Sequence, residues 1–183
     1  MVQGRGIDAH LNETGRKQAE QFYQAYKSES FDKVYVSTLI RTQESVSGFI
    51  KDGLPFQALP GLDEISWGSQ EGAAFTPEAA KLYYDTVQAW KDGKLDLAVG
   101  GGESPNQVAE RQKEAIEFIM NQTNEQKVLI CMHGRAMRVL MSWLTAQPLS
   151  SMDQFEHTNL GLYEVEHINT FRVLRANEQS HLA

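Results

Sequence analysis

Residues 127–140 read KVLICMHGRAMRVL, an apolar run that breaks at a glycine and continues into a helical pattern. The run KVLICM has the length and composition of a buried strand. After Gly134 the apolar residues recur at the spacing of one helix face. A buried strand that leads directly into a helix is typical of a parallel α/β sheet. This interpretation places His133 at the end of the strand, where the helix begins.

The rest of the chain repeats this alternation of strands and helices. Residues 31–37, FDKVYVS, predict a strand, and Ser37 and Thr38 are expected to cap a helix over 39–53 that ends at Gly53. Further elements are predicted as follows: helices over 11–28, 76–90 and 104–122, a short strand over 55–60, ordered loops over 61–72 and 92–104, and a hairpin of strands over 160–168 and 171–177. The expected fold is a three-layer α/β domain over residues 1–183, with a mainly parallel central sheet, helices on both faces and an antiparallel edge from the last hairpin.

Composition narrows the class of protein. The chain has 183 residues, 41% of them hydrophobic, and a formal net charge of -7, which argues against a nucleic-acid-binding surface. Its single cysteine, Cys131, excludes an internal disulfide and favours a reducing, cytoplasmic compartment. No apolar stretch approaches the roughly 20 residues that a membrane span needs, so no membrane association is expected.

The strand ends are where a ligand is expected, because parallel sheets bind ligands outside the carboxyl ends of their strands. Arg41 lies just beyond the strand over 31–37, and His133 ends the strand of the opening stretch. An arginine fork and a helix amino terminus both bind anions, so together they predict an oxyanion pocket, with phosphate as the expected ligand. Glu64, in the loop LDEISWGSQEG, is a candidate acid whose pKa burial would raise. Each residue also has an ordinary alternative: a core histidine, a solvated helix arginine and a solvated loop acid.

Four segments, taken in order, resemble the histidine phosphatase superfamily, also called the phosphoglycerate mutase-like family. They are QGRGIDAHLNETGRKQA (3–19), FDKVYVSTLIRTQESV (31–46), LDEISWGSQEG (62–72), and GGGES (100–104) followed by VLICMHGRAMRVL (128–140). The resemblance implies a phosphomonoester hydrolase in which a histidine attacks phosphorus and forms a phosphohistidine. It would make His133 the second histidine of the site, Arg41 a clamping arginine and Glu64 the proton donor.

The same resemblance implies the surroundings of the substrate. Gln3 and Gly4 would line its entrance, and Gly134 would let the backbone approach the phosphate. The substrate would be a small phosphorylated molecule. No cofactor and no metal ion are expected, since the family's chemistry needs none and no cluster in the sequence has metal-ligand spacing.

The sequence departs from the family at one point, because the family begins with a core strand that runs into an Arg-His-Gly motif. That strand supplies the nucleophilic histidine and a second arginine, and we find no such segment in these 183 residues. Surface or structural roles are expected for the other histidines: His10, His157, His167 and His181. The chain is therefore expected to be truncated at its amino end, or else an inactive relative, and to be inactive or nearly so by itself.

Two further expectations follow from this departure. Loss of an internal strand would leave neighbouring strands unpaired, so a rearranged segment, a strand from a second copy in a homodimer, or a collapsed sheet is expected to fill the place. A noncatalytic phosphate-binding protein and a phosphoglycerate mutase-type phosphotransferase remain as alternative functions. Tyr83, Tyr84 and Trp90 either cover an aromatic substrate or pack their helix against the core.

Overall fold

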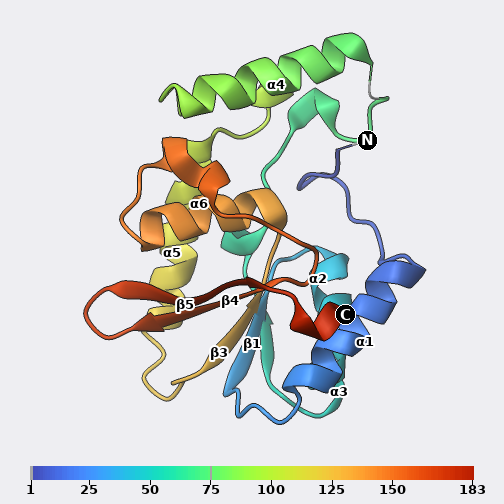
Figure 1. Ribbon diagram of the computed structural model, residues 1–183, viewed down its shortest axis with the longest axis vertical. Coiled ribbons are helices and arrows are strands. Elements are labelled where there is room, and N and C mark those ends of the chain that lie inside the picture. Colours follow the sequence, from blue (N-terminus) through green and yellow to red (C-terminus); the bar gives the residue numbers. More distant parts are fainter. Residues whose placement is uncertain (1, 75) are drawn as a thin grey trace.

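A sheet of three parallel strands lies at the centre of the computed structural model, which describes residues 2–74 and 76–183 (Figure 1). Val36 pairs with Cys131 in this sheet, so two strands end side by side at the same edge. In spatial order the strands are β2 (Phe56–Ala58), β1 (Lys33–Val36) and β3 (Val128–Cys131).

Helices cover both faces of the sheet, because side chains of β1 alternate between two apolar layers. Val34 and Val36 pack with Phe22 and Phe49 in one layer, and Tyr35 packs in the opposite layer. The predicted three-layer α/β fold is confirmed. The helices are α1 (Glu13–Tyr26), α2 (Ile40–Ser45), α3 (Ser47–Lys51), α4 (Pro77–Lys91), α5 (Pro105–Met120) and α6 (Gly134–Leu144). None of the helices in the described ranges combines the length and the apolar character that a membrane crossing requires.

Local capping explains where the longer helices begin. The side chain of Asn12 accepts the backbone N–H of Gly15 at the start of α1. Ser104 and Gln107 form a reciprocal capping box before α5, with Pro105 at its first position. Thr76 caps α4 in the same way as Asn12 caps α1. The predicted starts of these helices are thus confirmed.

The helix predicted over 39–53 is instead divided at Val46, whose φ of -114° and ψ of 15° are not helical. The predicted caps Ser37 and Thr38 are also wrong, since neither α2 nor α3 has a side-chain cap. The Ser37 hydroxyl oxygen accepts the N–H of Leu39, which precedes α2, and also contacts His133, whereas the Thr38 hydroxyl donates to Asp63. The predicted end is confirmed by Gly53, whose φ of +91° is a left-handed conformation that glycine adopts without steric cost.

The C-terminal hairpin forms as predicted, but it is not an edge of the parallel sheet. Its strands β4 (Leu162–His167) and β5 (Phe171–Glu178) pair only with each other within the described ranges. Leu162 nevertheless packs in the same layer as Val34, and Phe171 in the same layer as Tyr35. Both side-chain layers therefore continue from β3 to the hairpin, although no strand pairing joins the two backbones.

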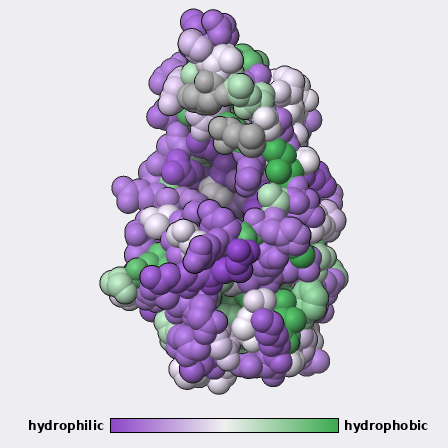
Figure 2. All heavy atoms as spheres, turned by 90° about the vertical axis from the view of Figure 1, so that its right-hand side faces the viewer, coloured by the Kyte–Doolittle hydropathy of each residue, from purple (hydrophilic) through white to green (hydrophobic). Residues whose placement is uncertain are grey.

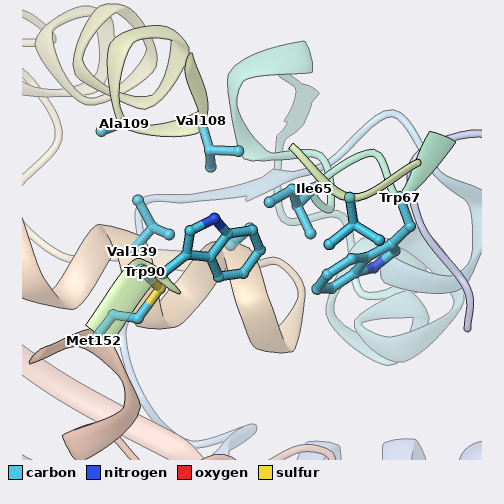
Figure 3. Close-up of a cluster of buried hydrophobic side chains, with 9 residues drawn as sticks. Ile65, Trp67, Trp90, Val108, Ala109, Val139 and Met152 are labelled. Atoms are coloured by element: carbon cyan, nitrogen blue, oxygen red, sulfur yellow. The ribbon is translucent and has the colours of Figure 1, made fainter. Parts of the chain in front are cut away.

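A third apolar cluster attaches α4 to the rest of the molecule (Figure 3). Trp90 of α4 is 1% exposed, lies near Trp67, and donates its indole N–H to the carbonyl of Leu97. Tyr83 packs against this cluster, whereas Tyr84 is exposed. For Trp90 and Tyr83, the interpretation as packing residues of the helix is confirmed.

Candidate functional site

The structure brings the predicted pair His133 and Arg41 together at the carboxyl edge of the sheet. Because β1 and β3 end side by side, the residues that follow them meet. His133 is 7% exposed, and its Nε2 lies 2.7 Å from the hydroxyl oxygen of Ser37. Arg41 donates its Nε–H to Nδ1 of His133 over 3.2 Å. Each of the two ring nitrogens of His133 thus has a hydrogen-bond partner.

These contacts determine the protonation of His133. An arginine only donates hydrogen bonds, so Nδ1 must accept, and the ring proton lies on Nε2 and is donated to Ser37. The Ser37 hydroxyl in turn lies 3.0 Å from the hydroxyl of Thr42. Burial is the largest of the effects that lower the pKa of His133 to about 3, and the neighbouring Arg41, Arg111 and His157 contribute the rest. His133 is therefore neutral near pH 7, and neither ring nitrogen is free to attack a substrate.

The other nitrogens of Arg41 bind the start of the chain. Nη1 donates to the carbonyl oxygen of Ile7 over 2.6 Å, and Nη2 donates to that of Gly4 over 3.3 Å. Gly4 is buried, and a Cβ at this position would lie 2.7 Å from the backbone carbonyl oxygen of Ile65, so only glycine fits. Gln3 is exposed. Of the two residues expected at the entrance, Gly4 contacts the arginine fork through its backbone.

The surroundings of Arg41 are rich in negative charge. Burial lowers the pKa of this guanidinium, and four nearby carboxylates oppose that shift: Glu64, Asp8, Asp63 and Glu71. Arg5 contributes a second positive charge, but it is paired with Asp63 over 3.1 Å. The carboxylates among these groups would repel a phosphate dianion placed beside Arg41. Phosphate binding at Arg41 therefore needs either a further cation or a rearrangement of these pairs.

Glu64 occupies the amino end of α6. Its Oε1 accepts the backbone N–H of Ala136 over 2.8 Å, and its Oε2 accepts that of Arg135 over 3.2 Å. Oε1 also accepts the N–H of Ile65. Burial raises the pKa of Glu64 despite these three donors, as the sequence analysis expected. The expectation of a helix terminus open to a ligand anion is corrected, because an internal carboxyl group already binds there.

We expect Glu64→Ala to lower the free energy of unfolding by about 1–3 kcal/mol, because buried N–H groups of α6 lose their acceptor. Glu64→Gln tests the charge separately. Since the folded-state pKa is raised, the unfolded state loses its proton first, and the parent should lose stability as pH rises above 4.5. His133 contributes equally to both proteins, so urea unfolding between pH 4 and pH 8 should show the parent losing stability relative to Glu64→Gln as pH rises. The exposed Glu114→Gln serves as control, and parallel curves for Glu64→Gln and the parent would contradict the assignment.

Arg111 of α5 is a site residue that sequence analysis missed. It donates to the carbonyl oxygens of Gly61, Asp63 and Glu64 over 2.9, 2.9 and 3.0 Å. Its Nε also pairs with Glu103 over 2.8 Å. Arg111 thereby holds the loop that carries Glu64. On the sequence it is one of several charges in a helix, and no local signal distinguishes it.

His157 also lies at the site, although a surface or structural role was expected for it. It follows the 3₁₀ helix η4 (Leu149–Gln154), and a Cβ on Gly134 would lie only 2.9 Å from its Nδ1. Gly134 thus leaves room for a histidine ring next to His133. The other histidines have the following contacts: His10 with Glu44 on α2, the helix that also carries Arg41, His167 with Phe171, and His181 with Leu160.

The surface that carries α1, α2 and the first residues of the chain is mostly hydrophilic and is hollowed near its middle (Figure 2). Within residues 2–74 and 76–183, no group of three or more histidine, cysteine or acidic side chains could hold a metal ion. The polar groups gathered at the carboxyl edge can bind an anion through Arg41, present a neutral imidazole and hold a protonatable carboxyl group.

Comparison with known proteins identifies the family. The chain is 30% identical over 148 residues to a metal-independent phosphoserine phosphatase of Arabidopsis thaliana, covering 79% of this chain and 61% of that protein. It is 26% identical over 172 residues to a probable phosphoglycerate mutase GpmB of Erwinia tasmaniensis, covering 91% of this chain and 77% of that protein. The solved structure of a mycobacterial glucosyl-3-phosphoglycerate phosphatase with inorganic phosphate superposes with a TM-score of 0.85 at 20% identity, covering 100% of this chain and 93% of that one. Residues 1–179 match the model of one family, and the chain belongs to the histidine phosphatase superfamily, branch 1.

Proposed function

We propose that this chain is part of a phosphomonoester hydrolase that works through a phosphohistidine intermediate. The observation that carries the proposal is the neutral His133, held between Arg41 and Ser37 at the carboxyl edge of the sheet. In this proposal Arg41 clamps the phosphate and His133 donates a hydrogen bond to it. Glu64, whose pKa burial raises, protonates the leaving group. The substrate is a small phosphorylated molecule.

The nucleophile, in this proposal, comes from outside these 183 residues. Both nitrogens of His133 already have hydrogen-bond partners, and Arg41 is surrounded by carboxylates. A strand that pairs between β3 and β4 would extend the two side-chain layers these elements share, and it could present a histidine and a second arginine at the same edge. This strand would come from a longer form of the chain or from a partner copy. The present chain is proposed to be inactive or nearly so.

The reaction assigns a definite task to each residue present here. Arg41 exchanges the carbonyl groups of Gly4 and Ile7 for phosphate oxygens as charge builds on them. The added imidazole attacks phosphorus in line, the P–O bond of the ester breaks, and Glu64 gives its proton to the departing oxygen. Water then attacks the phosphohistidine, Glu64 takes back a proton, and inorganic phosphate leaves. His133 stays neutral throughout.

Arg41 and His133 are also compatible with two alternative functions. A noncatalytic protein could bind phosphorylated ligands through Arg41 and His133 without turning them over. A phosphotransferase would use the same intermediate and pass the phosphoryl group to a second substrate, and the matched Erwinia protein is named as a probable mutase.

The decisive test compares hydrolysis of p-nitrophenyl phosphate by this chain and by a longer form that includes upstream coding sequence. We expect the longer form to be faster by at least roughly 100-fold, since it adds a positioned nucleophile. His133→Asn in the longer form should remove most of that gain. Equal rates for the two forms, or a longer form indifferent to His133→Asn, would contradict the proposal. Phosphate binding without turnover in both forms would favour the noncatalytic alternative.

A further inference from the structure

Two buried hydroxyl groups, those of Ser37 and Thr42, form a chain of hydrogen bonds behind His133. Nε2 of His133 lies 2.7 Å from the Ser37 hydroxyl oxygen, which lies 3.0 Å from that of Thr42. Ser37 is 0% exposed and Thr42 is 2% exposed. The backbone N–H of Ser37 also donates to the carbonyl oxygen of Cys131 over 3.2 Å. The sheet itself therefore holds this hydroxyl chain beside the end of β3, where His133 follows.

In the free protein the hydrogen bonds of this chain run away from the ring. Arg41 donates to Nδ1 of His133, so the ring proton lies on Nε2 and is donated to Ser37. The Ser37 oxygen also accepts the backbone N–H of Leu39 over 3.1 Å, so its own proton is donated to Thr42. Thr42 in turn donates to the carbonyl oxygen of Leu39 over 2.9 Å. Each of these polar hydrogens thus has an acceptor.

The same atoms also satisfy the opposite direction. A hydroxyl group both donates and accepts, so Thr42 can donate to Ser37, and Ser37 to Nε2 of His133, without movement of a heavy atom. The carbonyl oxygen of Leu39 then keeps the backbone N–H of Thr42, 3.1 Å away. In this direction the ring proton lies on Nδ1, where it faces the Nε–H of Arg41. Two donors that face each other need an acceptor between them, and a phosphate oxygen is one.

We propose that Ser37 and Thr42 are positioning residues that let His133 change its tautomer when phosphate binds at Arg41. The inference rests on the proposed function, in which His133 donates a hydrogen bond to the phosphate. A phosphate oxygen accepts from Arg41 and from Nδ1 of His133 together, and the hydroxyl chain reverses behind the ring. One proton passes from Nε2 to water and another from water to Nδ1, so the ring stays neutral. A carboxylate in place of Ser37 would only accept, and would hold the proton on Nε2.

Nitrogen NMR of isotope-labelled histidine tests the proposal, because the ring nitrogens of His133 give different shifts in the two neutral tautomers and in the imidazolium. At neutral pH we expect the Nε2–H tautomer in the free chain and the Nδ1–H tautomer at saturating inorganic phosphate. The same titration gives the dissociation constant for phosphate. Arg41→Gln should weaken this binding, since the proposed function places the phosphate there.

Thr42→Val separates a positioning role from a merely structural one. It leaves the Ser37 proton without an acceptor in the free protein, within residues 2–74 and 76–183, whereas Ser37 can still donate to Nε2 of His133 in the bound form. The variant should therefore shift His133 towards the Nδ1–H tautomer and bind phosphate roughly two- to tenfold more tightly, as one hydrogen bond would give. Thr42→Ser keeps the hydroxyl and should match the parent, and Thr170→Val in the exposed hairpin turn serves as control.

The outcomes distinguish this inference from the proposed function. Tautomer exchange in the parent with tighter binding by Thr42→Val would support both. Phosphate binding that depends on Arg41 but leaves His133 in the Nε2–H form, or converts it to imidazolium, would overturn the exchange and leave the proposed function standing. Weaker binding by Thr42→Val would overturn the positioning role of Thr42. If phosphate changes no resonance of His133, both the inference and the proposed function fail.

Discussion

Acidification from pH 6.5 towards pH 3 is expected to remove roughly 3–5 kcal/mol of the free energy of unfolding through His133 alone. The pKa of His133 is about 3 in the folded protein because the ring is buried beside Arg41, whereas the unfolded ring titrates near 6.5. Between these values the unfolded state binds the additional proton. The stabilising effect of the neutral ring is therefore complete above pH 6.5 and is lost as pH falls towards 3.

Urea unfolding of the parent and of His133→Asn over this range measures the effect. Near pH 7 the variant should be less stable, because Ser37 and Arg41 lose a partner. On acidification the parent should lose more stability than the variant, so the two curves converge. Glu103 and Asp153 have lowered pKa values and contribute to acid unfolding in both proteins, so their effects cancel in the difference. Curves that stay parallel from pH 7 to pH 3.5 would show that His133 is not held neutral.

Arg111→Met is expected to lower the free energy of unfolding by roughly 3–5 kcal/mol, the range for breaking a buried ion pair from one side. Arg111 and Glu103 are only 15% and 17% exposed, so the remaining carboxylate would have little water and would keep only the N–H of Ser66 and the half-exposed Arg5, 3.6 Å away, as partners. The carbonyl oxygens of Gly61, Asp63 and Glu64 would lose their donor at the same time.

Urea unfolding at neutral pH measures this loss, with Lys113→Met as the control. Lys113 lies on the same helix, is 58% exposed and pairs only weakly with Glu110. Arg111→Lys should recover little of the stability, because an ammonium group cannot reach several oxygens in the geometry of a planar fork. A loss below about 1 kcal/mol for Arg111→Met would contradict this prediction, because it would show that the ion pair and hydrogen bonds of Arg111 contribute little to stability.

The elements that the sequence predicted correctly depend on short-range chemistry. Asn12 and Ser104 cap their helices through residues three positions away, and Pro105 starts a helix because its missing N–H costs nothing there. The break at Val46 had no such signal. Ser37 and Thr38 look like caps on the sequence, but neither caps a helix in the structure, and their hydroxyl groups also bind His133 and Asp63, which lie far along the chain.

The residues of the site likewise fall into those that the sequence predicted and those that it did not. His133 and Arg41 could be predicted to meet, because both follow parallel strands and such strands end at one edge of a sheet. Glu64 was recognised as a candidate acid, yet its contact with the amino end of α6 joins residues more than 70 positions apart. Arg111 and His157 carried no signal at all, since an arginine in a helix and a histidine in a loop are ordinarily solvated.

The sequence by itself therefore determined the class of fold, the main helix boundaries and the pair of residues at the strand ends. Hydrophobic periodicity and capping act over a few residues, so they can be read without the fold. Only the tertiary structure decided that Glu64 closes the helix terminus, that Arg111 holds its loop and that the hairpin stands apart from β3. These features depend on which buried groups find partners across the chain, and that is settled only when the layers pack.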